Sequence, residues 1–208
     1  STFDDSVLVS DTYLKTGKGM EVNFINGSVA TIKGSMRIDG VLNIDDTSSV
    51  SVNGYFNAGA AGAASEHSDI LGTVNVAGTM NIKGTGPVEL LGGSVNVQNG
   101  GTLDLVNDND TRLDVLVDAN SELNINGNFT AGTITNNGAF AISGNSTVDV
   151  ALIKGNDVTV SGTLKDSNIT FETFDWETGN AMVDGELVID GGTFKNVQFR
   201  ADENEKVT

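Results

Sequence analysis

Residues 72–100 read GTVNVAGTMNIKGTGPVELLGGSVNVQNG, and this stretch decides the fold. It holds three copies of one phrase: glycine, a small polar residue, an apolar-x-apolar triplet and a small or turn-forming residue. The copies GTVNVAG at 72–78 and GSVNVQN at 93–99 are offset by 21 residues. In a strand, Val74 and Val76 would point to one face and Asn75 to the other. Each copy therefore predicts a short strand that ends at a glycine or asparagine turn.

The same phrase recurs along most of the chain. Its eleven copies are GSMRIDG at 34–40, GVLNIDD at 40–46, SSVSVNG at 48–54, GTVNVAG at 72–78, GTMNIKG at 78–84, GSVNVQNG at 93–100, GTLDLVN at 101–107, SELNING at 121–127, GAFAISG at 138–144, NDVTVSG at 156–162 and GELVIDG at 185–191. The apolar pairs follow one another more closely than the roughly 8–12-residue strand spacing of an antiparallel sandwich. Three such strands with their corners make a coil of about 18 to 24 residues. We therefore predict an all-β chain that forms a single parallel β-solenoid of roughly ten short coils, with a right-handed β-helix preferred.

The organisation predicted along the chain is one solenoid domain over residues 1–208. Residues 1–17 lack the phrase and are expected to form an N-terminal cap. Residues 57–69 (NAGAAGAASEHSD) break the strand rhythm and are expected to loop out of the stack, and residues 201–208 (ADENEKVT) are expected to form a polar tail. No composition shift divides the remaining chain into two domains.

The charge and residue counts exclude several classes of protein. With 28 acidic and 11 basic residues, the net charge is −17, which would repel the phosphates of nucleic acids. No apolar run reaches the roughly 18 residues of a spanning helix, so we expect no membrane insertion by this chain. The chain has no cysteine, and its one histidine, His67, lies in the 57–69 excursion. A zinc site or a Cys–His nucleophile is therefore not expected, and we predict that the protein is not an enzyme.

Three strings resemble the Gly/Asn-rich passenger repeats of autotransporter adhesins and related bacterial surface proteins. They are GTVNVAGTMNIKG at 72–84, GGSVNVQNGGTLDLVN at 92–107 and GTLKDSNITF at 162–171. The resemblance covers approximately residues 27–192 and consists of composition and rhythm. It implies a right-handed parallel β-helix that is extracellular or exposed at the surface of a bacterial cell.

A calcium site is the one cofactor site that the sequence suggests. The run NDNDTRLD at 107–114 places the carboxylates of Asp108, Asp110 and Asp114 close together in sequence. Calcium takes six to eight oxygen ligands, which such loops supply. The run lacks the glycine and the terminal glutamate of an EF-hand loop. The alternative interpretation is an acidic, solvated corner of the solenoid.

A glycan contact is the second candidate site. The segment FETFDW at 171–176 places Trp176 beside Glu172 and Asp175. An aromatic ring flanked by acids is a familiar arrangement for stacking on sugars. The alternative is that these aromatic residues pack in the core or at an end of the stack, where they bury large areas.

Three functions of different classes follow from the sequence. The first is a non-enzymatic structural or adhesive module of a bacterial cell-surface protein, with a glycan or protein of a host or neighbouring cell as its partner. The second is a fibre or surface-layer subunit that self-associates by stacking end to end. The third is a carbohydrate-active β-helix, such as a polysaccharide lyase or a tailspike-like protein, that uses carboxylates on adjacent coils.

Overall fold

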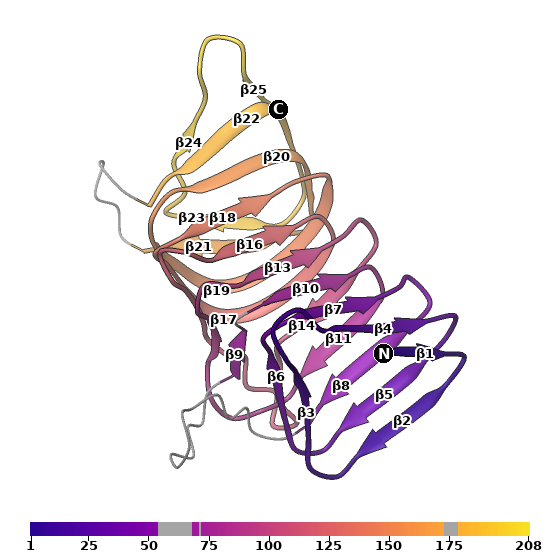
Figure 1. Ribbon diagram of the computed structural model, residues 1–208. Coiled ribbons are helices and arrows are strands. Elements are labelled where there is room, and N and C mark those ends of the chain that lie inside the picture. The colour runs from indigo at the N-terminus through magenta and orange to yellow at the C-terminus, as the bar shows by residue number, and fades with distance from the viewer. Residues whose placement is uncertain (54–67, 71, 173–178) are drawn as a thin grey trace.

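The chain forms a stack of coils, as the computed structural model of residues 1–53, 68–70, 72–172 and 179–208 shows (Figure 1). These residues form twenty-five strands and no helix. Strands of successive coils pair in parallel, and the stack has about nine turns. The predicted parallel β-solenoid is therefore confirmed, with slightly fewer turns than expected.

Each coil contributes strands to three faces. Face 1 consists of β1 (Thr2–Asp4), β4 (Glu21–Ile25), β7 (Val41–Ile44), β10 (Thr73–Val76), β13 (Ser94–Val97), β16 (Glu122–Ile125), β18 (Ala139–Ile142), β20 (Val158–Lys165), β22 (Ala181–Asp190) and β24 (Phe199–Arg200). Face 2 consists of β2 (Val7–Ser10), β5 (Val29–Ile32), β8 (Ser49–Val52), β11 (Thr79–Ile82), β14 (Thr102–Asp104), the first parts of β17 (Asn128–Asn136) and β19 (Asn145–Gly155), β21 (Asn168–Phe171) and β23 (Thr193–Lys195). Face 3 consists of β3 (Tyr13–Thr16), β6 (Ser35–Ile38), β9 (Ser68–Ile70), β12 (Val88–Leu90), β15 (Val115–Val117) and the later parts of β17 and β19.

The core lies inside the stack because alternate residues of most short strands point inward. In β10, Val74 and Val76 are fully buried, whereas Asn75 faces outward and is only partly buried. The register places Val74 opposite Val95 and Asn75 opposite Asn96, which is the 21-residue offset read from the sequence. One hydrophobic cluster extends along the coils from Val22 to Leu187. Since each inward residue lies on its equivalent in the next coil, the core is a set of apolar columns.

Several of the glycines that open a phrase lie at corners where two coils approach closely. A Cβ atom on Gly78 would lie 2.2 Å from the carbonyl oxygens of both Asp45 and Ser48 in the preceding coil. A Cβ on Gly72 would lie 2.0 Å from the carbonyl oxygen of Gly40. These contacts involve backbone atoms, which have little room to move. Glycine is therefore required here by space.

Three segments were predicted to interrupt the repeated strands, and the structure bears differently on each prediction. Residues 1–17, expected as a cap, form β1, β2 and β3, which make up the first coil. Of the 57–69 excursion, residues 57–67 lie outside the described residues, and residues 68–69 begin β9. The 201–208 segment was expected to be a tail, but its β25 (Lys206–Val207) pairs in parallel with Glu186 and Leu187 of β22. Within the described ranges, we find no helix with the length and hydrophobicity that crossing a bilayer requires.

Replacing a corner glycine tests the close approach of the coils. We expect Gly78→Ala to lower the free energy of unfolding by about 1–3 kcal/mol, because the new methyl group must displace backbone atoms. The matched control is Gly17→Ala, since a Cβ there would meet only the flexible Met20 side chain, at 3.2 Å from its sulfur. Chemical denaturation followed by circular dichroism measures both variants. Equal stability of Gly78→Ala and the unsubstituted protein would contradict the corner geometry.

Candidate functional site

A ladder of asparagine side chains runs along the outer surface of face 1. Each member is the central residue of an apolar-x-apolar triplet, and each member after Asn23 donates a hydrogen bond from Nδ2 to the Oδ1 atom of the member one coil earlier. The bonds run from Asn43 to Asn23 (2.7 Å), from Asn75 to Asn43 (2.8 Å), from Asn96 to Asn75 (2.9 Å) and from Asn124 to Asn96 (2.9 Å). The face 1 strands β4, β7, β10, β13 and β16 carry these residues, so the ladder crosses five coils.

The ladder gives face 1 a fixed and directional polar surface. All its bonds point the same way along the stack, so the amide dipoles are aligned and reinforce one another. An amide has two N–H donors and two acceptor lone pairs, and the ladder uses only one of each per inner member. The second N–H of Asn43 donates to Glu21 Oε1 at 2.8 Å, and the amides of the ladder repeat at the strand spacing of about 4.8 Å. A ligand lying on face 1 therefore meets donors and acceptors whose positions are set by the backbone.

A depression of about 400 Å³ lies beside the ladder. Asn43 and Asn75 line it on the ladder side, and the small side chain of Ala77 leaves room between Asp45 and Gln98. Successive coils supply these last three residues, since Ala77 N donates to the carbonyl of Ile44 and Gln98 N to that of Val76. Asp45, Ala77 and Gln98 belong to one outward-facing column, and the sizes of their side chains shape the surface beside the ladder.

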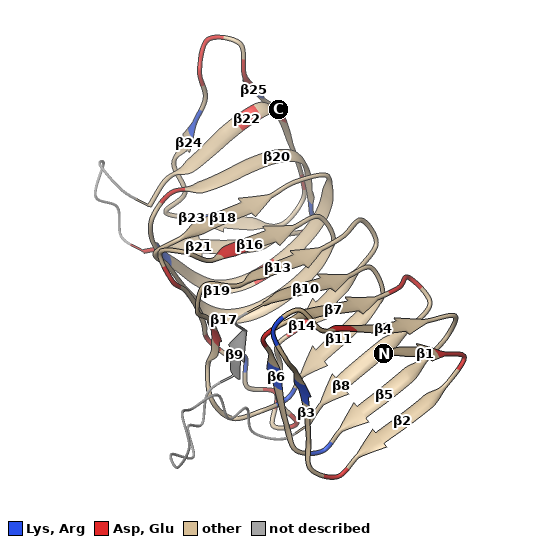
Figure 2. Cartoon of the chain, viewed as in Figure 1, with Lys and Arg blue, Asp and Glu red and all other residues tan. Residues whose placement is uncertain are grey.

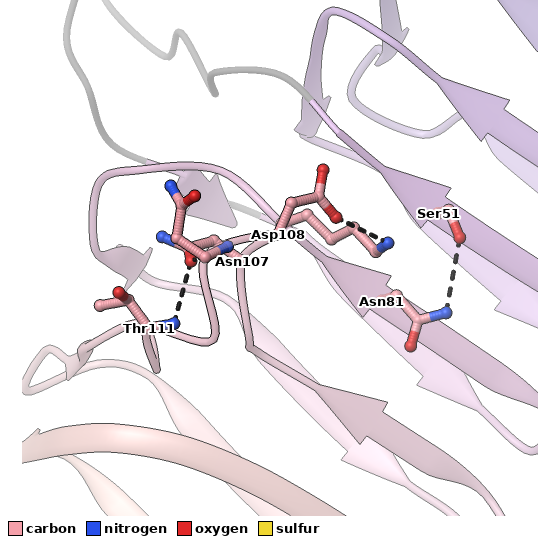
Figure 3. A network of polar contacts seen from close by, with 7 residues as sticks. Ser51, Asn81, Asn107, Asp108 and Thr111 are labelled. Atoms are coloured by element: carbon pink, nitrogen blue, oxygen red, sulfur yellow. Dashed lines mark hydrogen bonds and ion pairs between the residues drawn. The ribbon is translucent and has the colours of Figure 1, made fainter.

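A projecting hairpin, residues 105–113, emerges from face 2 after β14. Its two arms are joined by an antiparallel bridge between Val106 and Arg112 and by a 2.9 Å bond from the backbone N of Asn107 to the carbonyl of Thr111. The Asn107 side chain closes the turn by accepting a further bond from the backbone N of Thr111 (Figure 3). Since Leu105 and Leu113 are buried, the base of the hairpin is anchored in the core.

Ion pairs fasten the projecting hairpin to coils on either side of it. The ammonium group of Lys83, at the end of β11, lies 2.9 Å from a carboxylate oxygen of Asp108 (Figure 3). On the other side, the two terminal nitrogens of Arg112 donate to the two carboxylate oxygens of Asp149 on β19, at 2.9 and 2.5 Å. Burial raises the pKa of the nearby Asp104 carboxyl, and the positive charges of Lys83 and Arg112 oppose that rise. The two ion pairs therefore hold the projecting hairpin against face 2.

The structure places the three carboxylates predicted to bind calcium in different surroundings. Asp108 pairs with Lys83, and Asp114 Oδ1 accepts a 2.7 Å bond from the backbone N of Thr133. Asp110 occupies the turn of the hairpin with a φ of 56°. In the ranges that the structure describes, no three acidic or histidine side chains gather into a metal site. The structure therefore does not bring these carboxylates together around a cation.

The residues predicted to contact a glycan lie only partly within the described chain. Glu172 is exposed directly after β21, and its backbone N donates to the carbonyl of Ile153 at 2.8 Å. Asp175 and Trp176 lie outside the described residues. A glycan contact at this segment stays a prediction.

Acidic residues also stabilise the corners, a role that the sequence did not reveal. Asp118 Oδ1 accepts bonds from the Ser121 hydroxyl at 2.6 Å, from the backbone N of Asn120 at 3.0 Å and from the backbone N of Gly92, one coil earlier, at 3.2 Å. The Ser121 bond, with help from the two backbone donors, lowers the pKa of Asp118 against the opposing effect of burial. Figure 2 shows acidic residues at many of the turns that join strands. Part of the negative charge of the chain thus has a structural use.

Comparisons with known proteins give no further guide to the site. No protein-family model, no curated protein and no solved structure matches this chain.

Removing one member of the ladder tests its contribution to stability. Asn75 both donates and accepts in the ladder, so Asn75→Ala removes two side-chain bonds. We expect a loss of about 1–2 kcal/mol in the free energy of unfolding, because the amides of Asn43 and Asn96 each lose a partner. The matched control is Asn53→Ala at an exposed position outside the ladder. The measurement is urea denaturation. Equal midpoint urea concentrations for Asn75→Ala and Asn53→Ala would contradict the role of the ladder.

The corner carboxylate predicts a specific dependence of stability on pH. Because the pKa of Asp118 is lowered on folding, its contribution is present above its unfolded pKa of about 3.9 and is lost as the pH falls through the folded value. We expect Asp118→Asn to reduce stability at pH 7 and to flatten the fall in stability between about pH 5 and pH 2. The comparison is Asp110→Asn in the exposed turn of the projecting hairpin. An unchanged acid slope in Asp118→Asn would refute this assignment.

Proposed function

We propose that this protein is a non-enzymatic structural or adhesive module of a bacterial cell-surface protein, located outside the cell. The asparagine ladder is the observation that carries the proposal. It presents aligned amide groups on the outer surface of five successive coils, held by bonds of 2.7 to 2.9 Å. Such a surface suits an extended partner that repeats its own hydrogen-bonding groups, such as a surface glycan or a protein strand of a host or neighbouring cell.

The rigidity of the stack supports this role. Ordering a flexible binding surface costs conformational entropy at the moment of binding, and a surface already fixed by its fold avoids that cost. Face 1 is fixed from inside by fully buried residues such as Leu42 and Val74 and from outside by the ladder. The resemblance of 72–84 and 92–107 to passenger repeats of bacterial surface proteins supports the extracellular location.

A binding assay with face-specific variants tests the proposal. The purified chain is applied to arrays of mammalian glycans and of bacterial surface polysaccharides, with Ser94→Arg on face 1 and Ser51→Arg on face 2 as a matched pair. Both serines face outward and are partly buried, so both changes add the same charge and bulk. We expect binding that Ser94→Arg weakens at least fivefold and Ser51→Arg leaves unchanged.

The same incubations separate adhesion from catalysis. We expect no increase in reducing ends or in unsaturated sugar products over time. Steady product release from any bound polysaccharide would overturn the non-enzymatic assignment and favour a carbohydrate-active β-helix. Binding that both arginine variants weaken equally would remove face 1 as the contact surface.

The two ends of the stack favour a second candidate, a subunit that stacks end to end. Among the described residues, strands β1, β2 and β3 pair with the following coil alone, and their inward residues Phe3, Leu8 and Leu14 are partly buried. At the opposite end, Phe194 and Phe199 are partly buried and make an edge-to-face contact at 6.0 Å. Unpaired strand edges are templates for further pairing. Electron microscopy across a concentration series would show lengthening filaments for this candidate and short rods of one length for an isolated module.

A further inference from the structure

A second concave surface lies on face 2, apart from the asparagine ladder. It is a cleft of about 280 Å³ between the projecting hairpin and the last coils, lined by Arg112, Asp149, Val150, Ala151, Asn168, Ile169, Thr170, Thr193 and Lys195. The hairpin supplies Arg112, and three successive coils supply the rest through β19, β21 and β23. The cleft is therefore built from segments that are far apart in sequence.

The register of the strands sets the positions of the polar groups in the cleft. Asp149 lies opposite Asn168, which in turn lies opposite Thr193, so these three form one outward column. Thr170 lies opposite Lys195 in the neighbouring column. Ala151 also lines the cleft, and its small, exposed side chain leaves open space that a larger side chain would fill.

Within the described chain, most polar side chains that line the cleft have no hydrogen-bond partner. Both terminal nitrogens of Arg112 are engaged by Asp149, which neutralises that carboxylate. By contrast, the side chains of Asn168, Thr170, Thr193 and Lys195 make no hydrogen bond or ion pair to another described residue. The cleft therefore presents an ammonium group, an amide and two hydroxyls around a neutralised ion pair.

From this arrangement we infer that the cleft binds an acidic saccharide, with the Lys195 ammonium on the sugar carboxylate and Asn168, Thr170 and Thr193 on the ring hydroxyls. A bond between charged partners is shorter and stronger than a neutral one, so the carboxylate gives the site its preference. The cleft is open along face 2, which lets a longer chain continue beyond the bound unit. The inference rests on the proposed adhesive function and names the chemical class of one partner.

A titration followed by NMR tests the site with a defined probe. Trigalacturonic acid is the acidic probe and maltotriose the uncharged one. We expect trigalacturonic acid to shift the backbone amide signals of Asn168, Thr170 and Lys195, with a dissociation constant on the order of a millimolar or tighter. Maltotriose at the same concentrations is expected to leave these signals in place.

Variants of the cleft and of a distant lysine separate specific binding from general attraction. We expect Lys195→Ala to weaken binding at least fivefold, and Ala151→Leu to weaken it by filling the cleft without changing its charge. Lys33→Ala is the matched control, because Lys33 is also exposed at the end of a face 2 strand but pairs with Asp11 at 2.7 Å near the other end of the stack. It is expected to bind as the unsubstituted protein does.

Two results of the titration would overturn the inference. One is the absence of shifts at these amides up to about ten millimolar trigalacturonic acid, well above the expected dissociation constant. The other is an equal loss of affinity in Lys195→Ala and Lys33→Ala. If Ser94→Arg weakens array binding and Lys195→Ala does not, the adhesive function stays in place and this site is removed. Conversely, trigalacturonic acid binding that depends on Lys195, together with array binding that Ser94→Arg leaves unchanged, would support the cleft and remove face 1.

Discussion

The strands of this protein must lie in register with the equivalent strands of the neighbouring coils. A strand of four residues is too short to be stable alone, and its backbone groups are satisfied only by the neighbouring coils. Because the pairing is parallel, residues that face inward in one coil lie on residues that face inward in the next. The apolar columns, the corner glycines and the asparagine ladder are all consequences of that single constraint.

The same constraint links the fold to the proposed functions. An outward-facing side chain has an equivalent side chain one coil away, at a spacing of about 4.8 Å. On face 1 this repeats one residue type, so the amides of Asn43, Asn75 and Asn96 bond to one another. On face 2 it brings different residue types together, which is how Asn168 comes to lie beside Thr193 in the cleft. A repetitive surface and a local site thus arise from one architecture.

The sequence predicted the fold well because its strongest signal is the one the fold depends on. Alternating apolar residues and the 21-residue offset identify the strands and the pairing of Thr73 with Ser94. The ladder was harder to foresee, since the phrase does not tell which face a strand occupies. Asn81 stands in the same phrase as Asn75, yet it lies on face 2 and donates to the Ser51 hydroxyl instead (Figure 3).

The site on face 2 could not be predicted from the sequence. Coil lengths vary, so the spacing from Asn23 to Asn43 is 20 residues and that from Asn43 to Asn75 is 32. Distant pairs therefore cannot be aligned by counting, and the bond between Arg112 and Asp149 spans 37 residues. The acidic run at 107–114 suggested calcium because composition alone does not show that Lys83 reaches Asp108.

The most direct test of this account is the register itself, measured by interstrand backbone NOEs in solution. The parallel stack predicts contacts that join Asn75 to both Asn43 and Asn96, with the chain running in the same direction in all three strands. NOEs that pair β10 in antiparallel with a strand adjacent in sequence, such as β11, would contradict the solenoid and the surfaces derived from it.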